Sequence, residues 1–180
     1  MLRGGLSARD DPSAIESFVA PRMRRLAVPE DATTAKNPVP ASPEVLAEAM
    51  AHFADHCAFC HSNDGSGMTP IGQGLYPKAP DMRLDATQKL KDGEIFYIIH
   101  NGIRLTGMPA FGDASKGLND VDSWKLVHFI RRLPHLTPEE IEAMKKMNPK
   151  SPADLEEEAA LEKFLRGEDS EVPDPQHKHH

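Results

Sequence analysis

The only two cysteines of the 180-residue chain, Cys57 and Cys60, lie three positions apart, and His61 follows the second directly. Thiols at this spacing near the end of a helix share one face, so both can reach the two vinyl groups of a single porphyrin. The next residue then places an imidazole under the ring, where one of its nitrogens can bind iron. Because Cys-x-x-Cys-His is the attachment signature of a c-type haem, we predict one covalent haem c with His61 as an iron ligand.

Two other kinds of site use paired cysteines. A thioredoxin-like redox pair requires a βαβ context, which the sequence does not show. A zinc site of the common type requires four ligands, and the chain has no further cysteine to supply them. Covalent haem attachment therefore remains the favoured interpretation of Cys57 and Cys60.

A second axial ligand must reach the face of the haem opposite His61. Met108 lies in a loop framed by Gly107 and Pro109, and this loop can carry a thioether onto the distal face. Met82, which lies in another loop, is the alternative. Met68 follows His61 too closely to reach the opposite face. The remaining candidates lie on predicted helices, where a structural role is usual; they are Met144, Met147, His100 and His128. We predict Met108 as the second ligand.

Hydrophobic periodicity predicts helices, and no segment alternates convincingly at period two. The fold class is therefore all-α. Pro21 is expected to interrupt the first helical stretch. Long irregular loops are expected over 66–87 and 105–119. The predicted helices cover residues 14–26, 43 into the cysteine motif, 92–101, 120–133, 137–147 and 151–165.

The distribution of proline and charge suggests three regions. Residues 1–42 are predicted to be an N-terminal spacer, residues 43–133 the haem domain, and residues 134–180 a helical C-terminal extension with a flexible tail. Apolar residues at helical spacing predict that 137–165 wraps the haem domain as a belt, because isolated helices of this length are marginal in water. The net charge of −7 argues against nucleic acid as a partner.

The chain resembles class I c-type cytochromes, of the bacterial monohaem type found as haem domains of oxidase-associated subunits. The resemblance rests on the Cys57–His61 motif, the Asp92–Phe96 helix, the Gly107–Pro109 loop and the helix that carries Trp124. It covers about residues 43–133. It implies a cytochrome c fold, in which three or four core helices surround one covalent haem and the first and last helices cross.

Further details follow from the resemblance. Phe53 of the first helix is expected to pack against Trp124 or Phe129 of the last. A proline carbonyl in the loop after the motif is expected to accept a hydrogen bond from His61, and both Pro77 and Pro80 are candidates. Cationic side chains that could pair with haem propionates are Lys78, Arg83 and Arg104. The His-rich end, 177–180, could bind metal.

The expected function is electron transfer with redox partner proteins, without enzymatic activity, because His/Met ligation fills both axial sites. The alternative is a haem-based gas sensor in which Met108 is displaced. Since haem c is attached outside the bacterial cytoplasm, the resemblance implies a periplasmic protein. The start of the chain has no apolar signal region, and no apolar run approaches the length of about 20 residues that spans a bilayer. We therefore expect a preceding signal or, more specifically, a membrane anchor that tethers the domain through residues 1–42.

Overall fold

The computed structural model describes residues 7, 8 and 10–167, and all of their regular structure is helical. Strands are absent from this part of the chain, which confirms the all-α prediction. The His-rich segment 177–180 lies outside the described residues. The helices are α1 Ala14–Ala27, α2 Glu30–Thr34, α3 Pro43–His52, α4 Ala58–His61, α5 Pro70–Gly74, α6 Asp85–Gln88, α7 Asp92–Asn101, α8 Val121–Arg132, α9 Pro138–Lys145 and α10 Pro152–Leu165.

The cysteine motif lies at the end of a long helical segment made of α3, one π-helical turn over Phe53–Cys57, and α4. Ser42 begins this segment, and its side chain accepts a hydrogen bond from the Val45 amide at 3.2 Å. Pro43 occupies the first turn, where its missing N–H has no cost. The sequence predicted the helix but not the π turn, which shifts the face that the following cysteines present.

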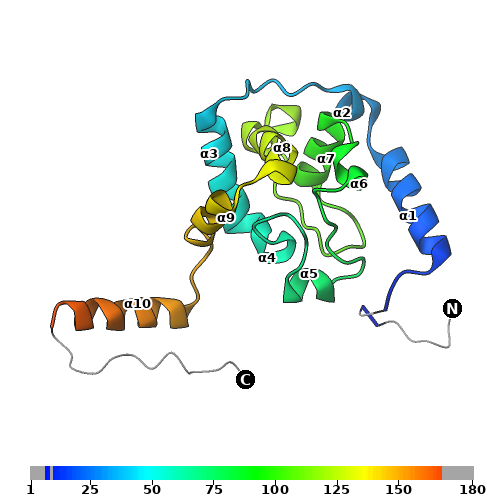
Figure 1. Ribbon diagram of the computed structural model, residues 1–180. Helices are drawn as coiled ribbons and strands as arrows, with labels where there is room; N and C mark the ends of the chain where they lie inside the picture. Colours follow the sequence, from blue (N-terminus) through cyan, green and yellow to red (C-terminus); the bar gives the residue numbers. More distant parts are fainter. Residues whose placement is uncertain (1–6, 9, 168–180) are drawn as a thin grey trace. The chain divides into compact units, whose positions relative to one another are not determined.

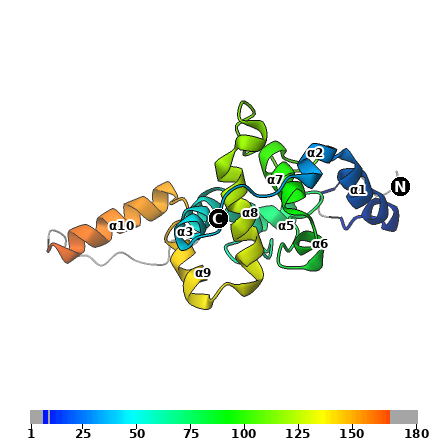
Figure 2. The same cartoon turned by 90° about the horizontal axis from the view of Figure 1, so that it is seen from above.

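Helix α8 lies between α3 and α7 and contacts both, as two views at right angles show (Figure 1; Figure 2). Two aromatic pairs join these helices. Phe53 meets Phe129 with ring centroids 5.0 Å apart, and Phe96 stacks on Trp124 at 4.2 Å. All four side chains are at most 2% exposed. Of the two expected partners of Phe53, Phe129 is the one that the structure confirms.

The loop predicted over 66–87 contains two short helices, so this prediction is partly wrong. Helix α5 begins at Thr69, whose hydroxyl accepts from the Gly72 amide at 2.8 Å, and Pro70 occupies its first turn. Helix α6 follows Leu84 directly. Both helices are only four or five residues long, and the glycines and prolines around them conceal any periodicity in the sequence.

The N-terminal segment includes two helices and an extended stretch. Helix α1 runs through Pro21 without a break, so the predicted interruption is wrong; proline costs a helix one hydrogen bond, but its fixed φ is helical. Ala32 of α2 is buried against α7. The extended chain then crosses α8 (Figure 1), where the Asn37 amide donates to the Trp124 carbonyl at 2.9 Å. His128 of α8 bonds the Val39 carbonyl at 2.7 Å.

The C-terminal helices differ from each other. Met144 of α9 is fully buried in the same core as α3 and α8, as the belt prediction requires. Helix α10 belongs to a second unit that begins at Pro149, and we describe it by itself. It buries none of its side chains, and its apolar residues Leu155, Leu161 and Leu165 are about half exposed or more. For α10 the belt stays a prediction, because its unit is described separately from the haem domain.

Candidate functional site

The two cysteine thiols are free and partly buried at the end of the motif helix. Burial, with a smaller effect of Cys60, raises the pKa of Cys57 to about 12. Burial also raises the pKa of Cys60. Reactive redox pairs show the opposite shift, since their chemistry requires an accessible thiolate. Within the described residues, no group of three or more Cys, His, Asp or Glu side chains could hold a metal ion. Both alternatives to haem attachment are thus disfavoured.

His61 is the last residue of α4, and its ring is largely buried. Its Nδ1 is buried without a hydrogen-bond partner. Burial lowers the imidazole pKa, while the Pro80 carbonyl acts in the opposite direction. This carbonyl therefore lies near the ring although the contact does not reach hydrogen-bond geometry. Of the two prolines considered, Pro80 is the one that interacts with His61. A neutral imidazole is the form that binds iron, and burial favours that form here.

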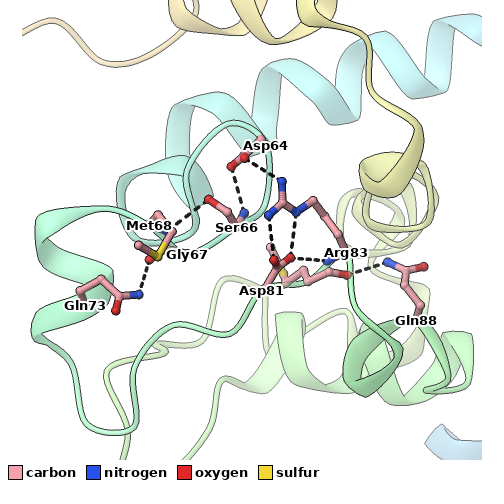
Figure 3. Close-up of polar contacts among 9 residues, drawn as sticks. Asp64, Ser66, Gly67, Met68, Gln73, Asp81, Arg83 and Gln88 are labelled. Atoms are coloured by element: carbon pink, nitrogen blue, oxygen red, sulfur yellow. Dashed lines mark hydrogen bonds and ion pairs between the residues drawn. The ribbon is translucent and has the colours of Figure 1, made fainter. Parts of the chain in front are cut away.

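Arg83 connects the loop that follows His61 with the loop that carries Pro80 (Figure 3). Its Nη1 donates to Asp64 at 2.9 Å, and its Nε and Nη2 donate to both oxygens of Asp81 at 2.9 and 2.8 Å. All three guanidinium nitrogens thus bind carboxylates of this chain. Arg83 therefore acts as a clamp between two loops, and its pairing with haem propionates stays a prediction.

The propionate pairing of the other two cationic candidates, Lys78 and Arg104, also stays a prediction. Lys78 forms an ion pair with Asp11 at 2.7 Å. Arg104 is exposed to solvent in the loop before Met108. Both side chains are therefore at least partly exposed to solvent.

Gly67 allows the two loops joined by Arg83 to touch. Its φ is +72°, and a Cβ there would lie 2.4 Å from the Ala79 carbonyl oxygen and 3.1 Å from the Pro80 oxygen. The Met82 amide donates to the Gly65 carbonyl at 2.8 Å. Gln73 donates to the Gly67 carbonyl at 2.9 Å (Figure 3). The backbone of 79–82 is therefore fixed to the loop on the His61 side of the site.

Met108 lies in the loop between α7 and α8 and is half-buried. Its carbonyl accepts from the Ile103 amide at 3.0 Å, and its amide donates to the Thr106 hydroxyl at 3.1 Å. Gly102 ends α7 with a φ of +67°, and a Cβ there would lie 2.7 Å from the Met108 carbonyl oxygen. The loop thus folds back against the end of α7. Met68, by contrast, is 70% exposed.

A narrow and mainly apolar cavity brings these parts together. His61, Met108 and Cys57 all lie on its wall, and Cys60 does not. An imidazole, a thioether and a thiol on an otherwise apolar wall are the kinds of group that hold a c-type haem. The residues present therefore fit this group. The full lining consists of Phe53, Cys57, His61, Met82, Ile99, Met108, Phe111, Leu126 and Ile130.

A comparison with known protein families agrees with this chemistry. The family model described as cytochrome C oxidase, cbb3-type, subunit III matches residues 44–130. This segment is a cytochrome c domain. It carries one covalent haem c, and its family consists of electron carriers rather than enzymes. No curated protein matches the chain significantly. No helix in the described part of the cytochrome chain is long and apolar enough to cross a membrane.

The sequence identified three of the cavity residues that bear chemistry, namely Cys57, His61 and Met108. It did not reveal the Arg83 clamp, because Asp64, Asp81 and Arg83 are ordinary loop charges until the fold brings them together. The spacing Asp81-x-Arg83 beside Pro80 was the only available signal.

Proposed function

We propose that this cytochrome c domain carries single electrons in the periplasm, with the haem attached to Cys57 and Cys60 and the iron bound axially by His61 and Met108. The observation that supports this proposal best is that His61, at the end of α4, and Met108, in the loop between α7 and α8, line the same apolar cavity. His61 and Met108 would together supply both iron ligands beyond the porphyrin, which would leave no open position for oxygen or peroxide chemistry and would restrict the domain to electron exchange.

Met82 lines the same cavity, so its position relative to His61 is important. Its amide is bonded to Gly65, four residues after His61, at 2.8 Å. Met82 therefore lies in the loop that is hydrogen-bonded to the segment directly after His61. Met108 lies instead in the loop that folds back against the end of α7. Axial ligands must approach iron from opposite faces, and this requirement favours Met108.

Each part of the chain has a distinct task in this mechanism. When bound, the haem supplies a one-electron couple. Burial lowers the pKa of His61 and so favours its neutral form, with the Pro80 carbonyl nearby. Met108 would supply a soft thioether ligand, of the kind that favours ferrous iron. Phe53, Ile99 and Leu126 line the cavity and would exclude water from the group that it holds.

We further propose that the redox partners are respiratory proteins, because the matching family model describes an oxidase subunit. A membrane anchor outside the described helices would hold the domain near such partners. Fractionation of the native host tests this point: the cytochrome should appear with the periplasm or the membrane. Recovery in the cytoplasm would contradict it.

Exposure of the reduced protein to carbon monoxide tests the closed coordination. A haem bound by His61 and Met108 should keep its reduced spectrum and should titrate as a single one-electron couple. Rapid carbon monoxide binding in the wild type would contradict an electron carrier with closed coordination and would favour a gas sensor with a displaceable methionine.

A further inference from the structure

A buried histidine–aspartate pair lies beside the Met108 loop and takes no part in the site described above. His100 of α7 and Asp120, the residue before α8, have side chains only 6% and 4% exposed. Nδ1 of His100 lies 3.0 Å from Oδ2 of Asp120. The His100 ring also stacks on Phe96, with centroids 5.3 Å apart. This pair connects the two helices at the ends of the Met108 loop.

Three hydrogen bonds converge on one oxygen of Asp120. Besides His100, Oδ2 accepts from the Ser123 hydroxyl at 2.9 Å and from the Asp113 amide at 3.2 Å. Burial alone would raise the pKa of Asp120, but the bonds from Ser123 and His100 outweigh it, and the net pKa is lowered. Asp120 is therefore an ionised acceptor, and hydrogen bonds to ionised groups are stronger than neutral ones.

The backbone of the loop is attached to the same place. The Phe111 amide donates to the Ile99 carbonyl and the Gly112 amide to the His100 carbonyl, both at 3.1 Å. A Cβ at Gly112 would lie 2.0 Å from Nδ1 of His100, so only glycine lets the loop pass the ring. Together with the Asp113 amide, three successive amides of the loop are bound beside the His100–Asp120 pair.

We propose that His100, Asp120 and Ser123 are positioning residues that hold residues 111–113 and thereby keep Met108 on the haem iron. This inference rests on the proposed role of Met108 as the axial ligand. Met108 is five residues from Asp113, whose amide is bonded to Asp120, and its own carbonyl is bonded to the Ile103 amide on the other side of the loop. The loop is thus bound at the Met108 carbonyl and at the Asp113 amide, and the short span between these two bonds cannot move far. Loss of the Asp120 side chain would remove the bond at Asp113.

The rate at which cyanide binds the ferric cytochrome measures this restraint, because cyanide binds only when the methionine ligand leaves. Asp120→Ala removes all three bonds and should raise the rate by about tenfold to a hundredfold, the equivalent of losing bonds to a charged acceptor. Asp120→Asn retains an acceptor oxygen and should have a smaller effect. Ser123→Ala removes one of the three bonds and should raise the rate slightly. It replaces Asp120→Ala as the test if that variant does not fold.

A matched control separates positioning from general loss of stability. Arg131 on α8 bonds Asp92 at 2.7 Å and the Gln88 carbonyl at 2.6 Å, away from the Met108 loop. Arg131→Met should lower the melting temperature and leave the cyanide rate unchanged. Hydrogen exchange supplies a readout that does not depend on the iron: the Asp113 amide should lose protection in Asp120→Ala and keep it in Arg131→Met.

The outcomes also separate this inference from the proposed function. If Met108→Ala binds cyanide no faster than the wild type, Met108 is not the ligand, and the proposed function fails. If Met108→Ala binds cyanide fast but the Asp120 and Ser123 variants match the wild type, the ligand assignment stands and the positioning role is overturned. Equal acceleration by Arg131→Met would also overturn it.

Discussion

At the scale of single residues, Gly67 has a role that only glycine can fill. Its positive φ and its contact with the Ala79 carbonyl leave no room for a side chain. Gly67→Ala should lower the free energy of unfolding by about 1–3 kcal/mol, as expected for a strained backbone conformation. Gly74→Ala is the control, because no atom lies within 4 Å of a Cβ there. Denaturant unfolding of both variants tests this; equal stability of the two would show that the loop contact has no energetic weight.

Arg83 should make stability depend on acidity. Its side-chain hydrogen bond is the main cause that lowers the pKa of Asp81 from the ordinary 3.8, against a smaller opposing effect of burial. A carboxyl group whose pKa is lower in the folded than in the unfolded protein stabilises the fold at pH values above its unfolded pKa. This stability is lost as the pH falls through the folded pKa. The unfolding free energy of the wild type should therefore decline below about pH 4.

Arg83→Gln removes the charge and should flatten this decline while it lowers stability at neutral pH. Unfolding measured from neutral to acid pH in both proteins checks the expectation. The same acid slope in Arg83→Gln and the wild type would exclude Asp81 as its source.

At the scale of elements, the motif helix is held by aromatic packing. Phe53 is 1% exposed and contacts Phe129, whereas Phe59, six residues later, is 65% exposed. Phe53→Ala should cost about 3–5 kcal/mol through the cavity it leaves. Phe59→Ala should change stability by less than about 0.5 kcal/mol, as is usual for surface positions. Chemical denaturation of both variants provides the test, and a comparable loss in Phe59→Ala would place the packing elsewhere.

Element prediction succeeded where several local signals agreed. Helix α7 was predicted with its observed bounds because apolar periodicity ends at Gly102, a left-handed position. Asp120 or Asp122 was predicted to cap helix α8, and Asp120 occupies the capping position directly before Val121. The π-helical turn before the motif was not predictable, since no residue type marks an extra residue per turn.

The site was predictable only in its covalent and ligand chemistry. Cys57 and His61 were expected from a fixed spacing and Met108 from its loop; all three line one cavity, and the ligand role of Met108 stays a prediction. His100 was correctly expected to be structural, but its partner Asp120 lies 20 positions away and no pattern links the two. Contacts of this kind depend on how α7 and α8 pack and not on local sequence.

At the scale of the whole molecule, the two C-terminal helices should contribute differently to stability. Removal of 137–180 deletes the buried Met144 and the bond between Asn63 and Asn148 at 2.9 Å. It should lower the melting temperature and leave the haem spectrum nearly unchanged. Removal of 149–180 deletes no buried side chain of the described helix α10 and should lower the melting temperature less than removal of 137–180 does. Equal losses in both truncations would contradict this, because the loss would then come from residues 149–180 and not from Met144.

Ligation of the iron by Met108 opposite His61 is the central claim, and proton NMR of the reduced cytochrome tests it most directly. A methionine methyl group bound to haem iron lies over the ring, whose current shifts its resonance far upfield of all other methyl signals. The wild type should show one such resonance, Met82→Ala should retain it, and Met108→Ala should lose it. Loss of the resonance in Met82→Ala with retention in Met108→Ala would contradict the proposed ligation.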